Sequence, residues 1–237
     1  MYESLFIRNL LFHAYPLNNE MLGMNLEYLA RYIRFFNGKK VVNVSMGPGL
    51  LSLDEFKSLM NEKCIEIEEI VFTVDESSPL GETKPFVENL LPEVESLDSR
   101  EITFYCHTKG VSHMDFTIPK IWMRLMWEGN LGDIRKVERI LETFPCCGVL
   151  KKGPGTVGEL TAPWHFSGTF FWFRNDRIFN NDWRKIDDHR CGVETYLSRR
   201  FDTNDAWCLK YDLKPRHGNT RLLRVWKDIL GDPDYDR

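Results

Sequence analysis

One run of four residues in this 237-residue sequence is well suited to chemistry on a phosphate group: His107, Thr108, Lys109 and Gly110. It directly follows residues 101–106, whose β-branched and aromatic side chains predict a strand. A lysine at a strand end, beside a hydroxyl and an imidazole, supplies a positive charge and donors for a diphosphate or a departing phosphate. Gly110 would let the backbone approach a ligand closely. Arg124 could add a second positive charge. The alternatives are a surface lysine in an ordinary loop and an exposed helical arginine.

A second group of residues lies in an aromatic stretch. Six aromatic side chains fall within residues 164–173, which predicts that residues 166–173 form a strand buried on both faces. A glycine inside such a strand indicates close approach of a ligand or another backbone. Aromatic faces also suit stacking on sugars or bases. The candidate sugar-binding residues are His165, Ser167, Gly168 and Trp172. The alternative is a core strand with a packing glycine.

The third group is acidic. Glu194 lies in the first turn of a helix expected over residues 192–201, where the helix dipole favours a carboxylate. It could be a capping residue only, or a general base toward an acceptor hydroxyl. The preceding Asp187, Asp188 and His189 raise the alternative of a phosphoryl-transfer enzyme or nuclease. No second acidic cluster supports that alternative, so it ranks lowest.

The elements that must position these groups alternate along the chain. Strands are expected over residues 40–46, 68–74, 101–106 and 147–150, with a loop over residues 152–163. One helix is expected over residues 25–36, a second begins after a capping box of Ser52 and Glu55, and a third begins at about residue 84. Further helices are expected over residues 118–143, with a break near Gly129 and Gly132, and over residues 222–230. Strands alternating with helices predict a single α/β domain with a mostly parallel central sheet flanked by helices.

Ligands of open parallel sheets bind beyond the carboxyl ends of the strands. Ser45 ends the first of these strands and Asp75 the second, and an ordinary solvated turn is the alternative for each. The residues after Ser45 have neither the GxGxxG nor the GxxxxGK[ST] spacing. We therefore expect neither a Rossmann dinucleotide site nor a P-loop.

Composition limits the class of protein. A net charge of −4 argues against a general nucleic-acid binder, and 43% hydrophobic with 13% aromatic residues excludes a disordered chain. The six cysteines form no CxxC pair, which favours reduced core thiols over disulfides or a zinc site. No stretch is apolar enough to span a bilayer and the N-terminus is a poor signal peptide, so we expect a cytoplasmic protein.

Taken together, the blocks FYCHTKGVS, WHFSGTFFWFRND and GVETYLSRRF resemble those of a group of bacterial and viral glycosyltransferase-like proteins with the GT-A fold. The likeness covers residues 41–201. It implies a nucleotide-sugar-binding half over residues 1–115 and an acceptor-side half over residues 116–237. It also implies that Ser45 and Asp75 lie near the nucleotide, and that Glu194 matches the acidic base of inverting members.

The resemblance places residues 107–110 where GT-A enzymes carry the Asp-x-Asp motif that holds a divalent metal. That motif is missing there, and its literal matches, such as Asp232 with Asp234, lie in the C-terminal tail. The resemblance leaves two alternatives for stabilising the donor diphosphate. Either a Mn²⁺ or Mg²⁺ ion binds it, with His217 as a further metal ligand, or the basic residues Lys109, His107 and Arg124 replace the metal.

The sequence thus favours a glycosyltransferase that moves a sugar from a nucleotide-sugar donor to an acceptor hydroxyl. The acceptor would be a glycan, a protein or, in a viral setting, modified DNA. The alternative is a catalytically degenerate module of the same fold that binds glycan or nucleic acid. The donor sugar, the stereochemistry and the oligomeric state stay open.

Overall fold

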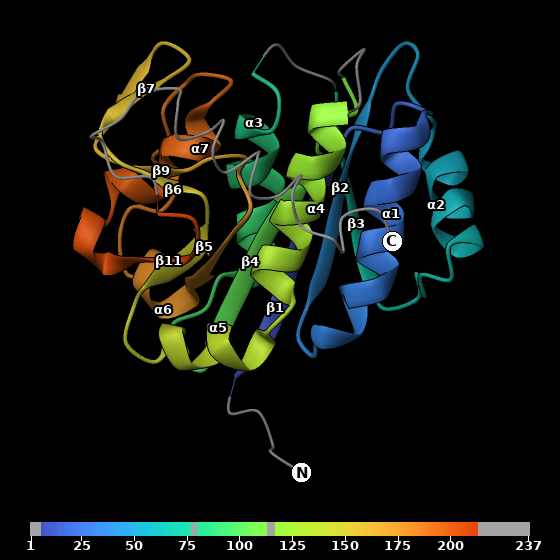
Figure 1. Ribbon diagram of the computed structural model, residues 1–237. Helices are drawn as coiled ribbons and strands as arrows, with labels where there is room; N and C mark the ends of the chain where they lie inside the picture. Colours follow the sequence, from blue (N-terminus) through green and yellow to red (C-terminus); the bar gives the residue numbers. More distant parts are fainter. Residues whose placement is uncertain (1–5, 77–79, 113–116, 213–237) are drawn as a thin grey trace.

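A seven-stranded sheet runs through the computed structural model, which describes residues 6–76, 80–112 and 117–212 (Figure 1). The strands lie in the order β11-β5-β10-β4-β1-β2-β3. They are β1 (Ile7–Ala14), β2 (Lys40–Met46), β3 (Ile70–Glu76), β4 (Glu101–His107), β5 (Cys146–Val149), β10 (Phe171–Arg174) and β11 (Ala206–Lys210). Neighbours pair in parallel except at β10, which is antiparallel to both β4 and β5. The predicted α/β fold with a mostly parallel sheet is confirmed.

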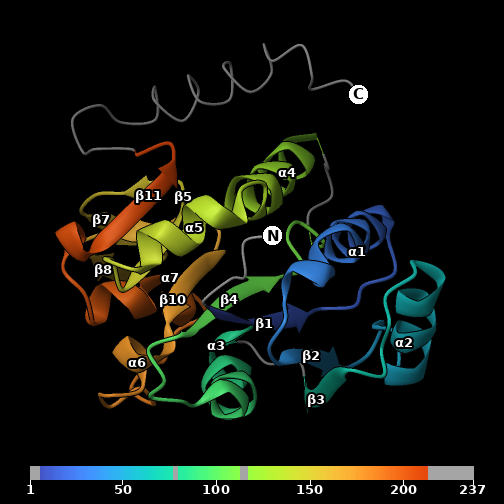
Figure 2. The ribbon, with the colours of Figure 1, turned by 90° about the horizontal axis from the view of Figure 1, so that it is seen from below.

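Helices cover both faces of the sheet (Figure 2). One face carries α1 (Glu20–Tyr32), α4 (Thr117–Leu131) and α5 (Ile134–Leu141), with α2 (Leu53–Glu62) beside α1. The other face carries α3 (Thr83–Pro85), which continues as a π-helical turn (Phe86–Leu90) and a 3-10 turn (Leu91–Val94), and α6 (Asn175–Ile178). The remaining short helices are α7 (Gly192–Tyr196) and the 3-10 turns Ile33–Phe35, Leu197–Arg199 and Thr203–Asp205.

The central strand β1 was not predicted from the sequence. It lies between β2 and β4, and its residues Leu10, Leu11 and Phe12 are fully buried. Leu10 and Phe12 pack under α1 and α4, whereas Leu11 belongs to the core cluster on the opposite face. Its sequence, IRNLLFHA, is a short apolar run with one β-branched residue, and periodicity alone does not distinguish such a run from part of a buried helix.

Local capping explains where the first two helices begin. Asn19 accepts a hydrogen bond from the Leu22 N–H at 3.1 Å and starts α1 at Glu20, five residues before the predicted start. The predicted capping box at Ser52 and Glu55 is confirmed, because each residue receives the other's backbone N–H. The predicted break is confirmed at Gly132, since α4 ends at Leu131 and Asp133 caps α5, but not at Gly129, which lies inside α4.

The aromatic stretch is two strands rather than one. β9 (His165–Phe166) pairs with β6 (Lys151–Lys152), and β10 joins the central sheet after a turn that contains Gly168 and Thr169. These two residues have φ of +100° and +60°, a left-handed backbone that breaks a strand. The prediction of a continuous strand over residues 166–173 was therefore wrong. Burial on both faces is confirmed, because Trp172 and Phe171 enter opposite core clusters.

Other predicted boundaries shift modestly. The second predicted strand begins and ends two residues later, as β3. The predicted loop over residues 152–163 contains the hairpin of β7 (Gly155–Val157) and β8 (Leu160–Ala162), and β11 was not predicted. The predicted helix over residues 222–230, His217 and the tail aspartates lie outside the described residues. Within the part of the chain that the structure describes, every helix is too short or too polar to cross a membrane.

Shortening a buried side chain of β1 tests its central place in the core. Leu10→Ala should lower the free energy of unfolding by about 3 kcal/mol, because Leu10 is 0% exposed and the substitution leaves a cavity. Ile7→Ala on the same strand is the control, since Ile7 is 37% exposed, and it should cost about 1 kcal/mol or less. Urea denaturation measures both. Equal losses would contradict the described core.

Candidate active site

A cavity of about 380 Å³ opens at the carboxyl ends of β1 and β4. Five residues predicted from the sequence line it: His107, Thr108, Lys109, Gly110 and Glu194. They come from segments more than 80 residues apart in the chain. The lining also includes His13, Tyr15, Glu82, Thr169, Arg190 and Cys191, none of which was predicted as a site residue. The cavity size falls in the range of about 300–1,000 Å³ that is usual for small-molecule sites.

The Gly168 turn links the two sides of this cavity. Its carbonyl oxygen lies 3.2 Å from His107 Nε2, and its N–H donates to Glu194 Oε1 over 3.3 Å. Gly168 has φ of +100°, and a Cβ at this position would lie 3.0 Å from Met126 Sδ and from Trp122 Nε1. Both the backbone conformation and the close approach of α4 therefore require a glycine here. The glycine lies in a turn rather than within a strand.

Glu82, just before α3, is a site residue that the sequence did not reveal. Its Oε2 lies 2.8 Å from His107 Nδ1 and also accepts the Tyr105 hydroxyl at 2.8 Å. Burial raises the pKa of Glu82, but His107, His13 and the Tyr105 hydroxyl outweigh it and lower that pKa to about 2. The local sequence gave no signal, because a glutamate ahead of Thr83 and Pro85 is typical of any helix start.

Lys109 is held by α1 and α4. Its backbone N–H donates to Asn25 Oδ1 at 3.2 Å, and its carbonyl accepts from Asn25 Nδ2 at 3.0 Å. Its ammonium lies 4.1 Å from the centre of the Trp122 ring. Burial lowers the pKa of Lys109, and the nearby Glu194 and Glu82 partly oppose this shift. The side chain thus presents a poorly solvated cation to the cavity.

Glu194, at the start of α7, is a poorly solvated carboxylate. Burial raises its pKa, while Lys109, the Gly168 N–H and Lys152 oppose that shift. His165 Nε2 lies 3.8 Å from Glu194 Oε1, and burial together with Lys152 lowers the pKa of His165 to about 4. A carboxylate with a raised pKa, facing a cavity, is suited to take up a proton during a reaction.

Thr108 joins the ends of β1 and β4. Its hydroxyl accepts the Tyr15 N–H at 2.9 Å, and its own N–H donates to the His13 carbonyl at 3.0 Å. The cavity floor is therefore a fixed piece of backbone. Gly110, with φ of +82°, lies against Met21 and Pro119, where a Cβ would be only 2.8 Å from each.

Ser45 and Asp75 lie beside the cavity rather than on its lining. The Ser45 hydroxyl donates to Asp75 Oδ1 at 3.2 Å and lies 3.4 Å from His13 Nε2. Asn43 connects the same groups, since its Nδ2 faces both Asp75 Oδ1 and His13 Nδ1. His13 therefore joins this polar cluster, at the ends of β1, β2 and β3, to the cavity that it lines.

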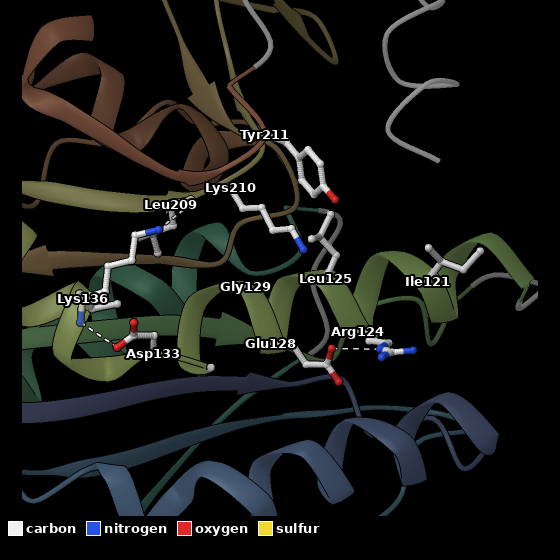
Figure 3. A pocket seen from close by; sticks show the side chains of 12 residues that line it. Ile121, Arg124, Leu125, Glu128, Gly129, Asp133, Lys136, Leu209, Lys210 and Tyr211 are labelled. Carbon is white, nitrogen blue, oxygen red and sulfur yellow. Dashed lines mark hydrogen bonds and ion pairs between the residues drawn. The ribbon is translucent and has the colours of Figure 1, made fainter. Parts of the chain in front are cut away.

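Arg124, Trp172 and Ser167 lie elsewhere than predicted. Arg124 lines a different pocket on α4, where its Nε donates to Glu128 at 3.0 Å (Figure 3). Trp172 is 0% exposed and packs against Phe104, with its ring nitrogen on the Asn130 carbonyl. Ser167 is buried and donates its N–H to the Leu150 carbonyl. Helical periodicity and strand alternation could not reveal which face these three side chains occupy.

The acidic cluster before α7 has a structural role. Asp187 Oδ2 accepts from Thr195 Oγ1 and Arg199 Nε, each at 2.8 Å, and His189 Nδ1 accepts the Cys191 N–H at 3.0 Å. These bonds hold the start of α7 and so fix Glu194. Nothing in this arrangement offers the pair of free carboxylates that a metal-dependent nuclease would need.

A divalent metal does not fit the described residues. Among residues 6–76, 80–112 and 117–212, no three His, Cys, Asp or Glu side chains gather closely enough to hold a metal ion. Glu82, the carboxylate that faces the end of β4, accepts from the Tyr105 hydroxyl and lies 2.8 Å from His107 Nδ1. The six cysteines are all free thiols, and Cys106, Cys146 and Cys147 are buried.

The chain matches no protein family model and no curated protein sequence. Among solved structures it is similar to a 4-diphosphocytidyl-2C-methyl-D-erythritol synthase, with 11% identity and a TM-score of 0.34. The similarity covers 92% of this chain and 98% of that one. A likeness this distant leaves the assignment of function to the site itself.

Gly168 provides a test of the turn. Gly168→Ala should lower the free energy of unfolding by about 2–4 kcal/mol, because both the positive φ and the contacts with α4 oppose a methyl group. Gly49→Ala is the matched control, since Gly49 has φ of +79° but nothing within 4 Å of a new Cβ. Chemical denaturation of both variants separates backbone strain from steric overlap. Equal losses would show that α4 does not constrain the turn.

Proposed function

We propose that this protein is a glycosyltransferase that moves a sugar from a nucleotide-sugar donor to an acceptor hydroxyl. One observation carries the proposal: the HTKG block and Glu194 of the GVE block line one cavity, and Gly168 of the HFSG block contacts both His107 and Glu194 through its two backbone polar groups. The sheet, with its single reversed strand, agrees with the GT-A-like fold that these blocks indicate.

In this proposal the donor lies across the carboxyl ends of the strands. The cluster of Ser45, Asp75 and His13 lies on the nucleotide side, and the donor diphosphate lies against Thr108, Lys109 and Gly110. The Lys109 ammonium opposes the negative charge that develops on the departing diphosphate. Arg190, which also lines the cavity, takes the place that the sequence suggested for Arg124. Residues 1–115 then form the donor half and residues 116–237 the acceptor half.

Glu194 is the proposed general base. It removes the proton from the acceptor hydroxyl, whose oxygen attacks the anomeric carbon from the side opposite the diphosphate. The bond between that carbon and the diphosphate oxygen breaks, and the leaving group takes its electron pair. Such a single displacement inverts the anomeric carbon. The step uses Glu194 and Lys109 and requires no metal ligand from the described residues.

The second candidate is a degenerate module of the same fold that binds a glycan or nucleic acid without turnover. The lack of a metal-binding acidic cluster in the described part of the chain favours it. A panel of UDP-, GDP-, dTDP- and CMP-sugars, tested for binding and for transfer or hydrolysis with and without Mn²⁺, separates the candidates. Binding without any turnover would support the module. No response to any donor by folded protein would contradict both the transferase and a donor-binding module.

Lys109 should control donor affinity. A donor that binds the folded protein raises its melting temperature. Lys109→Ala should weaken donor binding by about 10- to 100-fold, because a charge-assisted contact is worth about 1.5–3 kcal/mol. Lys185→Ala is the control, since Lys185 is exposed and lines another pocket. Thermal-shift titrations with the best donor measure both. Equal affinity in the two variants would place the diphosphate elsewhere.

Glu194 should control turnover and its dependence on pH. Glu194→Gln should lower kcat by about 10²- to 10⁴-fold and leave donor binding intact, because only the base is lost. The base works when ionised, and burial raises its pKa, so kcat should fall on the acid side at a higher pH than an ordinary glutamate would give. Glu159→Gln, at an exposed carboxylate, is the control. An active Glu194→Gln variant would exclude this mechanism.

A further inference from the structure

The ring of His107 lies between two hydrogen-bond acceptors. Nδ1 is 2.8 Å from the Glu82 carboxylate, and Nε2 is 3.2 Å from the carbonyl oxygen of Gly168. A carbonyl oxygen cannot donate, and neither can an ionised carboxylate. A neutral imidazole carries one N–H, so it could satisfy only one of these two neighbours. Both contacts are hydrogen bonds only if both nitrogens carry protons.

We propose that His107 is a protonated positioning residue, an imidazolium held by Glu82 that fixes the Gly168 turn and, through the Gly168 N–H, the carboxylate of Glu194. This assignment differs from direct contact of His107 with a diphosphate, because both ring nitrogens already have protein partners. The protonation state stands on the geometry alone. The effect on catalysis rests on the proposed transferase function.

One other arrangement of protons would satisfy the same distances. Glu82 could be a neutral acid that donates to Nδ1, leaving a neutral ring with its proton on Nε2. The surroundings of Glu82 oppose this. In that arrangement Oε2 would carry the proton of the acid, and a protonated carboxyl oxygen is a poor acceptor. The Tyr105 hydroxyl donates to this same oxygen at 2.8 Å, which favours the ionised carboxylate.

The other rings near His107, those of Phe170 and His13, carry no charge. Phe170 presents its ring edge to the imidazole, with ring centres 5.6 Å apart. His13, across the cavity floor, is neutral by the same reasoning. The Asp75 carboxylate can only accept, so the Asn43 group that faces it is the amide nitrogen, Nδ2. The same Nδ2 faces His13 Nδ1, and because it is a donor, His13 Nδ1 must accept. Burial lowers the pKa of His13 as well, although Glu82 and Asp75 oppose the shift.

Of these three buried or half-buried histidines, one is thus charged and two are neutral. His107 carries a proton on both nitrogens. His13 carries one on Nε2, because its Nδ1 is an acceptor. His165 is neutral, because burial and Lys152 lower its pKa to about 4, and its Nδ1 is buried without a hydrogen-bond partner. His13 and His165 are therefore internal controls for His107.

Imidazole ¹⁵N NMR of the ligand-free wild-type protein tests the proposal directly. In one sample, His107 should show two protonated nitrogens, whereas His13 and His165 should each show one. Couplings between each ring and its own backbone assign the signals, so no variant is needed. A neutral His107 with its proton on Nε2 would establish the other arrangement and overturn the proposal.

Glu82→Gln tests the link to the base. Removing the carboxylate removes the charged acceptor at Nδ1, so His107 should lose its second proton, seen in the same spectrum. With an active donor and acceptor, kcat should fall by up to about 10²-fold with KM for the donor unchanged, because the base is misplaced while the donor contacts remain. Glu88→Gln, at an exposed ion pair, is the control. An unchanged kcat with a deprotonated His107 would contradict the positioning role.

The two proposals fail in different ways. If no donor or acceptor supports transfer but His107 is an imidazolium, the transferase function falls and the assignment of the ion pair remains. If transfer occurs and depends on Glu194 while His107 is neutral, the positioning role falls and the transferase function remains.

Discussion

The site depends on one residue, Gly168, whose two backbone polar groups serve two different side chains. Its carbonyl oxygen faces His107 and its N–H faces Glu194. Since both groups belong to the same residue, its backbone dihedrals set the angle between them, and φ of +100° is a value that a side chain would resist. The relative orientation of β4 and α7 across the cavity is thus fixed by backbone conformation rather than by flexible side chains. Packing of Trp122 and Met126 against the turn keeps that conformation in place.

Charge balance around the cavity gives the second constraint. Two carboxylates, Glu82 and Glu194, lie near four cationic groups: Lys109, Lys152, Arg190 and the proposed imidazolium of His107. Poorly solvated charges are costly unless partners offset them, so this excess of positive charge favours a bound anion. A diphosphate would supply that charge at the strand ends. A protein built to hold a divalent cation there would instead show an excess of carboxylates.

The sequence predicted those parts of the fold and site that depend on local chemistry. Lys109 and Gly110 follow a strand whose β-branched and aromatic composition is plain, and Glu194 begins a helix. The sequence did not reveal β1, because this short apolar run has one β-branched residue and could equally be part of a buried helix. Nor could it reveal Glu82, whose role arises only because the sheet brings the β4 end against the start of α3. Trp172 was predicted to bind sugar, but it is buried in the core. The sequence shows that the residue is aromatic and does not show whether its ring faces a ligand or packs inside the protein.

The state of Glu194 bears on the choice between an enzyme and a binding module. Burial raises the pKa of Glu194 in the folded protein. At neutral pH, ionisation of this carboxylate is therefore less favourable in the folded protein than in the unfolded chain. The burial of this carboxylate therefore lowers the stability of the fold at that pH. A glutamine would still accept the Gly168 N–H, but it would leave the Lys109 ammonium without this opposing charge. A base that must take up a proton gains from the raised pKa, and this favours a catalytic role for the cavity.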